Sequence, residues 1–239
     1  MRLRYRSILL VPACLAAFAS LASGQILINE IRTDNTGTDT DEYFELVGPA
    51  NTPLTGYTYV VLGDGSSSSN SGGCSGVIES FADLSSFSIQ ADGYFAARNS
   101  AATPVLTGYD ASIALAFENT DNVTHLLVTG FTGSLTQDLD TNDDGVLDVT
   151  PWTSIVDSIG LSKGSAYNCP VSGANEEYLY TPNVVGPDGS FVPGMVRRCS
   201  TGLVIGPFGS LTIDTPGAVN NCTVAVTPAP WSQVKVLFR

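Results

Sequence analysis

An acidic stretch in the middle of the chain, DLDTNDDGVLD from Asp138 to Asp148, has the residue types and spacing of a calcium-binding loop. In its best register, oxygen-bearing side chains stand at loop positions 1, 3, 5 and 9, and these residues are Asp140, Asn142, Asp144 and Asp148. Gly145 at position 6 would permit a sharp turn, and Val146 at position 7 would donate its backbone carbonyl. Because hard cations prefer oxygen ligands, the stretch predicts a calcium site.

The last position of this loop departs from the usual pattern. Pro151 stands at position 12, where such loops carry a bidentate acid, so Asp157 or a residue of another loop would have to complete the site. We therefore expect weak affinity, with a Kd of roughly 10⁻⁴ to 10⁻³ M. The stretch is similar to the calcium loops of dockerins and thrombospondin type 3 repeats. The alternative is a solvated acidic turn, and a filled site would stiffen a long loop rather than catalyse a reaction.

Residues that could carry out catalysis are scarce elsewhere in the chain. The single histidine, His125, lies in the stretch VTHLLV and is more typical of a surface strand residue than of a general base. No G-x-S-x-G motif is present, so a serine hydrolase would lack a recognisable nucleophile. Paired carboxylates for glycoside hydrolysis are conceivable among 23 acidic residues, but nothing in the sequence selects a pair. We therefore predict that the chain is not an enzyme.

Composition and charge exclude several other classes of protein. The chain has 239 residues, of which 43% are hydrophobic and 14% charged, so it is too apolar for a disordered acidic tail. It contains 24 glycines and 13 prolines, which favour turns over long helices. A formal net charge of −13 with a pI near 4.1 argues against nucleic acid as a partner.

The N-terminus has the three parts of a secretory signal peptide. Three arginines at positions 2, 4 and 6 precede an apolar run over 8–22, and small residues end it at Ala22-Ser23-Gly24. The run is too short for a membrane-spanning helix, and Pro12 argues against a lipoprotein anchored at Cys14. Cleavage after Gly24 would lower the formal net charge from −13 to −16. We expect a secreted or cell-surface protein with no membrane span after cleavage.

Four cysteines remain after the predicted cleavage, and they are Cys74, Cys169, Cys199 and Cys222. An even number in an exported chain indicates two disulfides, which allow three pairings. We favour Cys169 with Cys199 or Cys222, because all three lie in the last third of the chain. A zinc site built from the four thiolates would require C-x-x-C pairs, and there are none.

Short segments rich in β-branched and aromatic residues alternate with turn signals along the chain. The clearest predicted strands cover 26–31, 43–47, 57–62, 93–98, 125–128 and 154–159, with weaker ones at 77–78 and 87–89. Only the segment from Ala111 to Phe117 suggests a helix, and it is equally compatible with a strand. Glu45 lies inside a predicted strand, where we expect it to face solvent. The alternatives are a pair with a residue such as Arg98 or a structural hydrogen-bond role. The sequence therefore predicts an all-β fold.

The order of several short motifs resembles the opening of bacterial lamin tail domains. The matching segment is ILINEIRTD…DEYFELVGPANTPLTGYTYVVLGDG, and its matching residues are Asn29, Glu30, Ile31, Glu42, Phe44, Glu45, Leu46, Leu54, Gly56 and Tyr57. Later matches are SIQADGYFAARNS, NTDNVTHLLVTG, SIVDSIGL and DTPGAVN. The resemblance implies an immunoglobulin-like β-sandwich with long loops, and it implies no catalytic reaction.

On this basis we divide the chain into four parts. They are a signal peptide at 1–24, a lamin-tail-like β-sandwich at 25–165, a disulfide-pinned extension packed on it at 166–222, and a linker with an apolar tail at 223–239. The ending WSQVKVLFR is either a sorting or docking tag, or a last strand or frayed apolar end.

Two functions remain open at this point. The first is a non-catalytic, calcium-stabilised structural or binding module, whose partner would be an unknown protein or glycan at the cell surface. The second is a secreted hydrolase of glycans or phosphoesters with an unrecognised carboxylate or calcium site.

Overall fold

The computed structural model describes residues 24–38, 41–65, 75–101, 104–115, 117, 119, 121–164 and 178–222. Within these residues the protein is all-β, as predicted, and contains no helix. None of the described segments is therefore a helix that could cross a membrane. Nearly all of the predicted signal peptide and the whole tail at 223–239 lie outside the described residues.

Eleven strands in the described part of the chain form two mixed sheets. The first sheet contains β1 (Leu27–Arg32), β2 (Tyr43–Val47), β5 (Tyr94–Asn99), β6 (Ala111–Ile113), β10 (Met195–Cys199) and β11 (Gly202–Ile205). The second contains β3 (Tyr57–Gly63), β4 (Val77–Asp83), β7 (Val123–Thr129), β8 (Ser154–Leu161) and β9 (Val184–Val185). Their orders are β11-β10-β1-β2-β5-β6 and β4-β3-β7-β8-β9, with parallel pairs only at β5–β6 and β8–β9.

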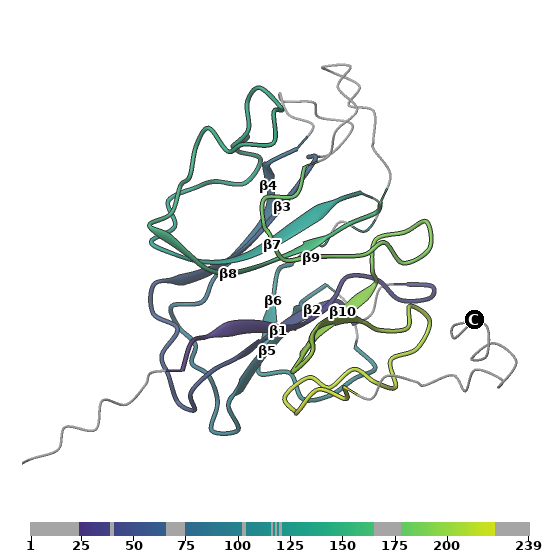
Figure 1. The fold of residues 1–239 in the computed structure, drawn as a ribbon. Coiled ribbons are helices and arrows are strands. Elements are labelled where there is room, and N and C mark those ends of the chain that lie inside the picture. The colour runs from purple at the N-terminus through teal and green to yellow at the C-terminus, as the bar shows by residue number, and fades with distance from the viewer. Residues whose placement is uncertain are drawn as a thin grey trace, which may run out of the picture.

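The main hydrophobic core lies between these sheets, which Figure 1 shows one above the other. Alternate residues of each strand face this core, because successive side chains of a strand point to opposite faces. Phe44 of β2 stacks on Tyr59 of β3, with ring centroids 3.8 Å apart. A second apolar cluster covers the other face of the β3–β4–β7 sheet, where the loop at 131–153 packs against it. The chain thus has the layered arrangement of a sandwich.

The predicted strands agree well with the observed ones where alternation is strong. The segment at 87–89 forms only an isolated bridge, between Ser88 and Pro53, and the ambiguous segment from Ala111 begins with the short strand β6. The region at 178–222 adds strands to both sheets, since β10 pairs with β1 and β9 pairs with β8. This part of the chain is therefore integral to both sheets.

One disulfide lies within the described residues, between Cys199 and Cys222. Our preference for Cys169 as the partner of either cysteine was wrong. The reason is that residues 206–222, which we call the C-terminal strap, fold back along β1 and return the chain to the end of β10. The Asn220 side chain donates a hydrogen bond to the Arg198 carbonyl at 2.9 Å, which brings Cys222 beside Cys199. Cys74 and Cys169 lie outside the described residues.

Candidate functional site

The acidic loop at 138–148 is built around the fully buried carboxylate of Asp140. This carboxylate accepts hydrogen bonds from the backbone N–H groups of Asp144 at 3.2 Å and Gly145 at 2.8 Å. It also accepts one from the Tyr180 hydroxyl at 2.7 Å, and that hydroxyl in turn contacts the Ser75 hydroxyl at 2.7 Å. Gly145 has a φ of 83°, so the glycine does supply the sharp turn that the pattern required.

The other predicted ligands lie in the same loop and bond mainly to one another. The Asp148 carboxylate accepts hydrogen bonds from the backbone N–H and the hydroxyl of Thr141, at 3.0 and 2.6 Å. The Asn142 amide donates to Asp144 at 3.1 Å, and the Val146 N–H donates to the same carboxylate at 2.9 Å. The loop is therefore organised by its own hydrogen bonds, with Asp144 and Asp148 at the surface.

Asp157, the predicted substitute for the missing last ligand, has another role. Its carboxylate pairs with Arg198 of β10 at 2.6 Å and accepts a hydrogen bond from the backbone N–H of Ile28 at 2.8 Å. These contacts connect β8 of one sheet with β1 and β10 of the other. Asp157 therefore joins the two sheets, and the sequence could not show this because Ile28 lies 129 residues away.

A second acidic group, which sequence reasoning missed, lies where β3 ends and β4 begins. Carboxylate oxygens of Asp64, Glu79 and Asp121 lie within 4.8 Å of one another. The Gly65 N–H donates to Glu79 at 3.1 Å, and a Cβ atom added at Gly63 would lie 2.4 Å from the Glu79 carboxylate. Within the described residues, these three carboxylates lie close enough together to share a cation. The sequence indicated only a turn there, Gly63-Asp64-Gly65.

A buried polar cluster lies under the C-terminal strap, on the face of β1 and β2 that points away from the main core. Glu30 of β1 stands directly opposite Glu45 of β2, and both are fully buried. Glu30 accepts hydrogen bonds from the backbone N–H and the hydroxyl of Thr215, at 3.2 and 3.1 Å. Glu45 accepts one from the Gly217 N–H at 2.6 Å. We call this cluster the strap layer.

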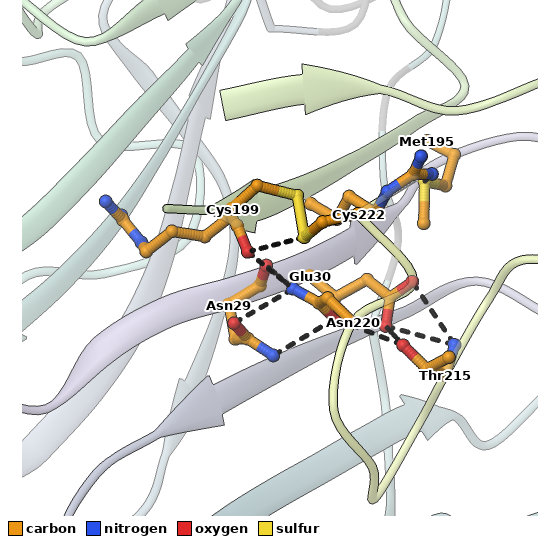
Figure 2. The surroundings of a disulfide bond; sticks show 9 residues. Asn29, Glu30, Met195, Cys199, Thr215, Asn220 and Cys222 are labelled. Carbon is orange, nitrogen blue, oxygen red and sulfur yellow. Dashed lines mark hydrogen bonds between the residues drawn. A yellow bond between two sulfur atoms is a disulfide. The ribbon is translucent and has the colours of Figure 1, made fainter. Parts of the chain in front are cut away.

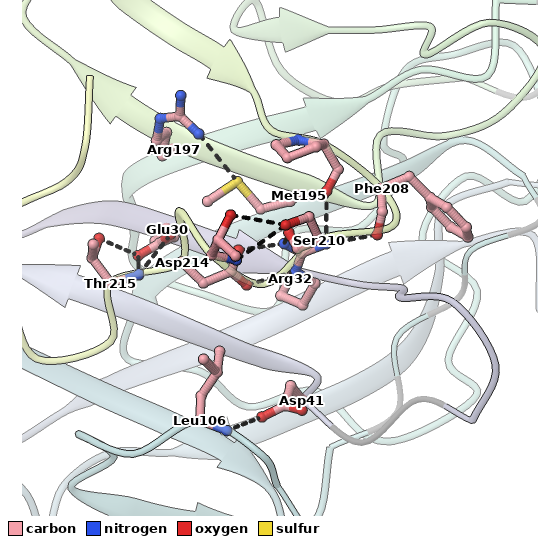
Figure 3. Close-up of polar contacts among 12 residues, drawn as sticks. Glu30, Arg32, Asp41, Leu106, Met195, Arg197, Phe208, Ser210, Asp214 and Thr215 are labelled. Atoms are coloured by element: carbon pink, nitrogen blue, oxygen red, sulfur yellow. Dashed lines mark hydrogen bonds and ion pairs between the residues drawn. The ribbon is translucent and has the colours of Figure 1, made fainter. Parts of the chain in front are cut away.

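Two further contacts hold the strap in place. The Asn220 amide donates to the side-chain oxygen and the backbone carbonyl of Asn29, at 3.0 and 3.2 Å (Figure 2). The Asn29 amide in turn donates to Glu45 at 2.6 Å. Arg32 forms a buried ion pair with Asp214 through two hydrogen bonds, beside Ser210 and Phe208 in Figure 3. Our expectation that Glu45 faces solvent was therefore wrong, because the strap covers that face of the strand.

Burial sets the protonation of both glutamates. Desolvation raises the pKa of Glu45 to about 8, although its hydrogen bonds from Asn29 and Gly217 act in the opposite direction. Desolvation and the neighbouring charge of Asp214 raise the pKa of Glu30 to about 7, against the hydrogen bonds from Thr215. Both carboxyl groups therefore titrate near neutrality. Arg32, which lies in the same layer, is already paired with Asp214.

The single histidine is a core residue, so our prediction of a surface position was wrong. His125 of β7 stands opposite Val61 of β3 and Ile159 of β8, which both belong to the main core. Its Nδ1 atom lies 3.0 Å from the Tyr59 hydroxyl, and desolvation lowers its pKa to about 3. A fully buried, neutral imidazole in the core has no access to a substrate in solution.

Comparisons with known proteins identified no relative: no family model, curated protein or solved structure matches the chain.

Proposed function

We propose that this protein is an exported, non-catalytic structural or binding module of the lamin-tail, immunoglobulin-like type, which acts at the cell surface or outside the cell. The motif order from Asn29 to Tyr57 and the signal-peptide pattern support this proposal. The two-sheet architecture and the Cys199–Cys222 disulfide are consistent with it, because structural disulfides persist mainly in oxidising compartments. Its partner is a protein or glycan of that surface.

The non-catalytic assignment is supported by what the buried carboxylates bind. Several of them hold a covering segment by accepting hydrogen bonds from backbone N–H groups. Asp41 accepts such bonds from Val105 at 3.0 Å and Leu106 at 2.8 Å, and the latter appears in Figure 3. Glu45 does the same for Gly217 in the strap, and Asp140 for Gly145 in the acidic loop. Acids used in this way position loops, which is a structural role.

A direct assay distinguishes binding from hydrolysis. The purified chain, incubated with insoluble surface glycans or envelope fractions, is expected to sediment with its partner and to release neither reducing sugar nor phosphate. Release of either product in proportion to the amount of protein would contradict the non-catalytic assignment. A heat-unfolded sample of the same chain serves as the control for non-specific sedimentation.

We further propose that calcium stabilises the module through the acidic loop at 138–148. The Asp140 hydrogen bonds fix the turn at Gly145, and carboxylate oxygens of Asp144 and Asp148 remain near the surface. With a Kd of roughly 10⁻⁴ to 10⁻³ M, 10 mM calcium would stabilise the folded chain by about 1.4 to 2.7 kcal/mol. This shift is large enough to measure by thermal unfolding.

Thermal unfolding with calcium and then with chelator tests this part of the proposal. We expect Tm to rise with calcium, and the rise to disappear in a variant that carries Asp144→Asn and Asp148→Asn, whose side chains are exposed. The matched variant is Asp121→Asn, in the second acidic group. Loss of the calcium response only in Asp121→Asn would move the site to that group, and no response in the unaltered chain would rule out calcium stabilisation.

A further inference from the structure

The C-terminal strap is closed at one end by a covalent bond and held elsewhere by polar contacts. The disulfide joins residues 23 positions apart, so the chain between Cys199 and Cys222 forms a closed loop. Inside this loop, Thr215 donates to Glu30 and Gly217 donates to Glu45, as Figures 2 and 3 show for Thr215. Breaking these contacts would open the strap without releasing it from the protein.

The two glutamates that hold the strap face each other across neighbouring strands. Their Cα atoms are direct partners in the β1–β2 pairing, and like charges at such positions repel. The cations nearby do not compensate for both charges. Arg32 is paired with Asp214, and Arg197, opposite Glu30 on β10, turns its guanidinium toward the Met195 sulfur at 3.8 Å (Figure 3).

The remaining titratable groups around this pair are mostly acidic or phenolic. The charged and titratable side chains that face Glu30 and Glu45 from the surrounding elements are Arg32 of β1, Asp41 and Tyr43 at β2, Tyr94 and Arg98 of β5, Tyr109 and Asp110 before β6, Arg197 of β10, and Asp214 of the strap. Ionisation of both glutamates would therefore place two more negative charges in a buried layer that already holds the carboxylate of Asp214.

We propose that the C-terminal strap is a pH-controlled clasp, closed over β1 and β2 while Glu30 and Glu45 carry protons and opened when both lose them. The direction follows from linkage. Opening returns the carboxyl groups to water, where their pKa is near 4.5, whereas the closed layer raises it to about 7 for Glu30 and about 8 for Glu45. The closed form therefore binds protons more tightly, and rising pH between these values favours opening.

Hydrogen exchange of the intact, disulfide-bonded chain tests this device. Protection factors, corrected for the intrinsic exchange rate at each pH, are measured for the strap and for β3 and β7 in the second sheet. Between pH 6 and pH 9, we expect protection of the amides of Thr215 and Gly217 to fall by about tenfold or more. Protection in β3 and β7 is expected to change far less. A strap whose protection is independent of pH would overturn the proposal.

Two variants separate the glutamates from other titrating groups. The double substitution Glu30→Gln and Glu45→Gln removes both titrations and is expected to flatten the pH dependence in the strap. The matched control is Asp92→Asn, an exposed acid just before β5, which should leave the dependence unchanged. If the double variant keeps the dependence of the unaltered chain, the glutamates are not responsible.

A third measurement does not depend on any variant being folded. The side-chain carboxyl ¹³C shifts of Glu30 and Glu45 in the unaltered chain report their protonation directly. We expect both to titrate above pH 6, and titration of both below pH 5 would refute the clasp. The result is independent of the calcium proposal, because the acidic loop covers the other sheet.

Discussion

The ion pair between Arg32 and Asp214 shows how strongly single residues hold the strap. Neither side chain is exposed to solvent, and Arg32 also donates to the backbone carbonyls of Pro207, Phe208 and Ser210. Replacing Asp214 with alanine would leave a buried guanidinium without its counter-charge. We expect Asp214→Ala to lower the free energy of unfolding by about 3 to 5 kcal/mol, measured by urea denaturation.

Two further variants test this explanation. Asp188→Ala, in a half-buried turn, removes an equal charge and should cost less than about 1 kcal/mol. The double substitution Arg32→Met and Asp214→Leu should recover much of the loss, because it replaces the buried charges with apolar groups. If Asp214→Ala costs no more than Asp188→Ala, the pair does not stabilise the strap.

A substitution at Gly145 tests how much the turn of the acidic loop depends on glycine. Its φ of 83° is strained for any other residue, and an added Cβ would lie 2.6 Å from the ring of Tyr178. Gly56 has a similar φ of 80° but open space around it. We expect Gly56→Ala to lower the free energy of unfolding by about 1 to 3 kcal/mol and Gly145→Ala to lower it further. Equal losses in chemical denaturation would show that Tyr178 moves aside without cost.

Sequence reasoning failed at Glu45 and His125 for the same physical reason. The strap residue that bonds to Glu45, Gly217, lies 172 positions away, and the partner of His125, Tyr59, lies 66 positions away. Local alternation says only that a residue shares a face with its neighbours two positions along. It does not say which face a later segment will cover. The burial of both residues therefore depends on contacts that only the folded chain reveals.

At the scale of elements, prediction succeeded where the signal was local. The strand Tyr57–Gly63 is a run of β-branched and aromatic residues that ends at a glycine turn, and β2 and β8 have comparable composition. By contrast, β9 and β11 are short segments that become strands by pairing with elements formed elsewhere. The strap has no repeating pattern at all, so neither its position nor the strap layer could be predicted.

The disulfide also limits how the remaining cysteines can pair. Because Cys199 bonds to Cys222, any second intramolecular disulfide in a chain cleaved after Gly24, which lacks Cys14, must join Cys74 to Cys169. Peptide mapping of the exported chain without reduction is expected to recover these two cysteines in one linked pair of peptides. Recovery of free thiols at both positions would contradict the prediction, and the Cys199–Cys222 pair serves as the internal control for complete oxidation.

For the whole molecule, two buried glutamates and one buried histidine change the free energy of unfolding with pH in opposite directions. Glu30 and Glu45 have raised pKa values in the folded chain, so their contribution is complete below about pH 4.5 and declines as pH rises toward 7 and 8. His125 has a lowered pKa, so its contribution is complete above pH 6.5 and declines as pH falls toward 3. Each group changes the free energy of unfolding by about 1.4 kcal/mol per pH unit inside its own range.

Between pH 4.5 and 6.5 the two glutamates outweigh the single histidine, and below pH 4.5 only the histidine contributes a slope. These groups therefore place the maximum stability on the acidic side of neutrality, at about pH 4.5. Urea denaturation from pH 3 to 9 measures the profile. His125→Gln keeps a polar partner for Tyr59 and should reduce the decline on the acid side, whereas Glu45→Gln should reduce it on the alkaline side. A maximum above pH 7 in the unaltered chain would show that these buried groups do not control the stability of the sandwich.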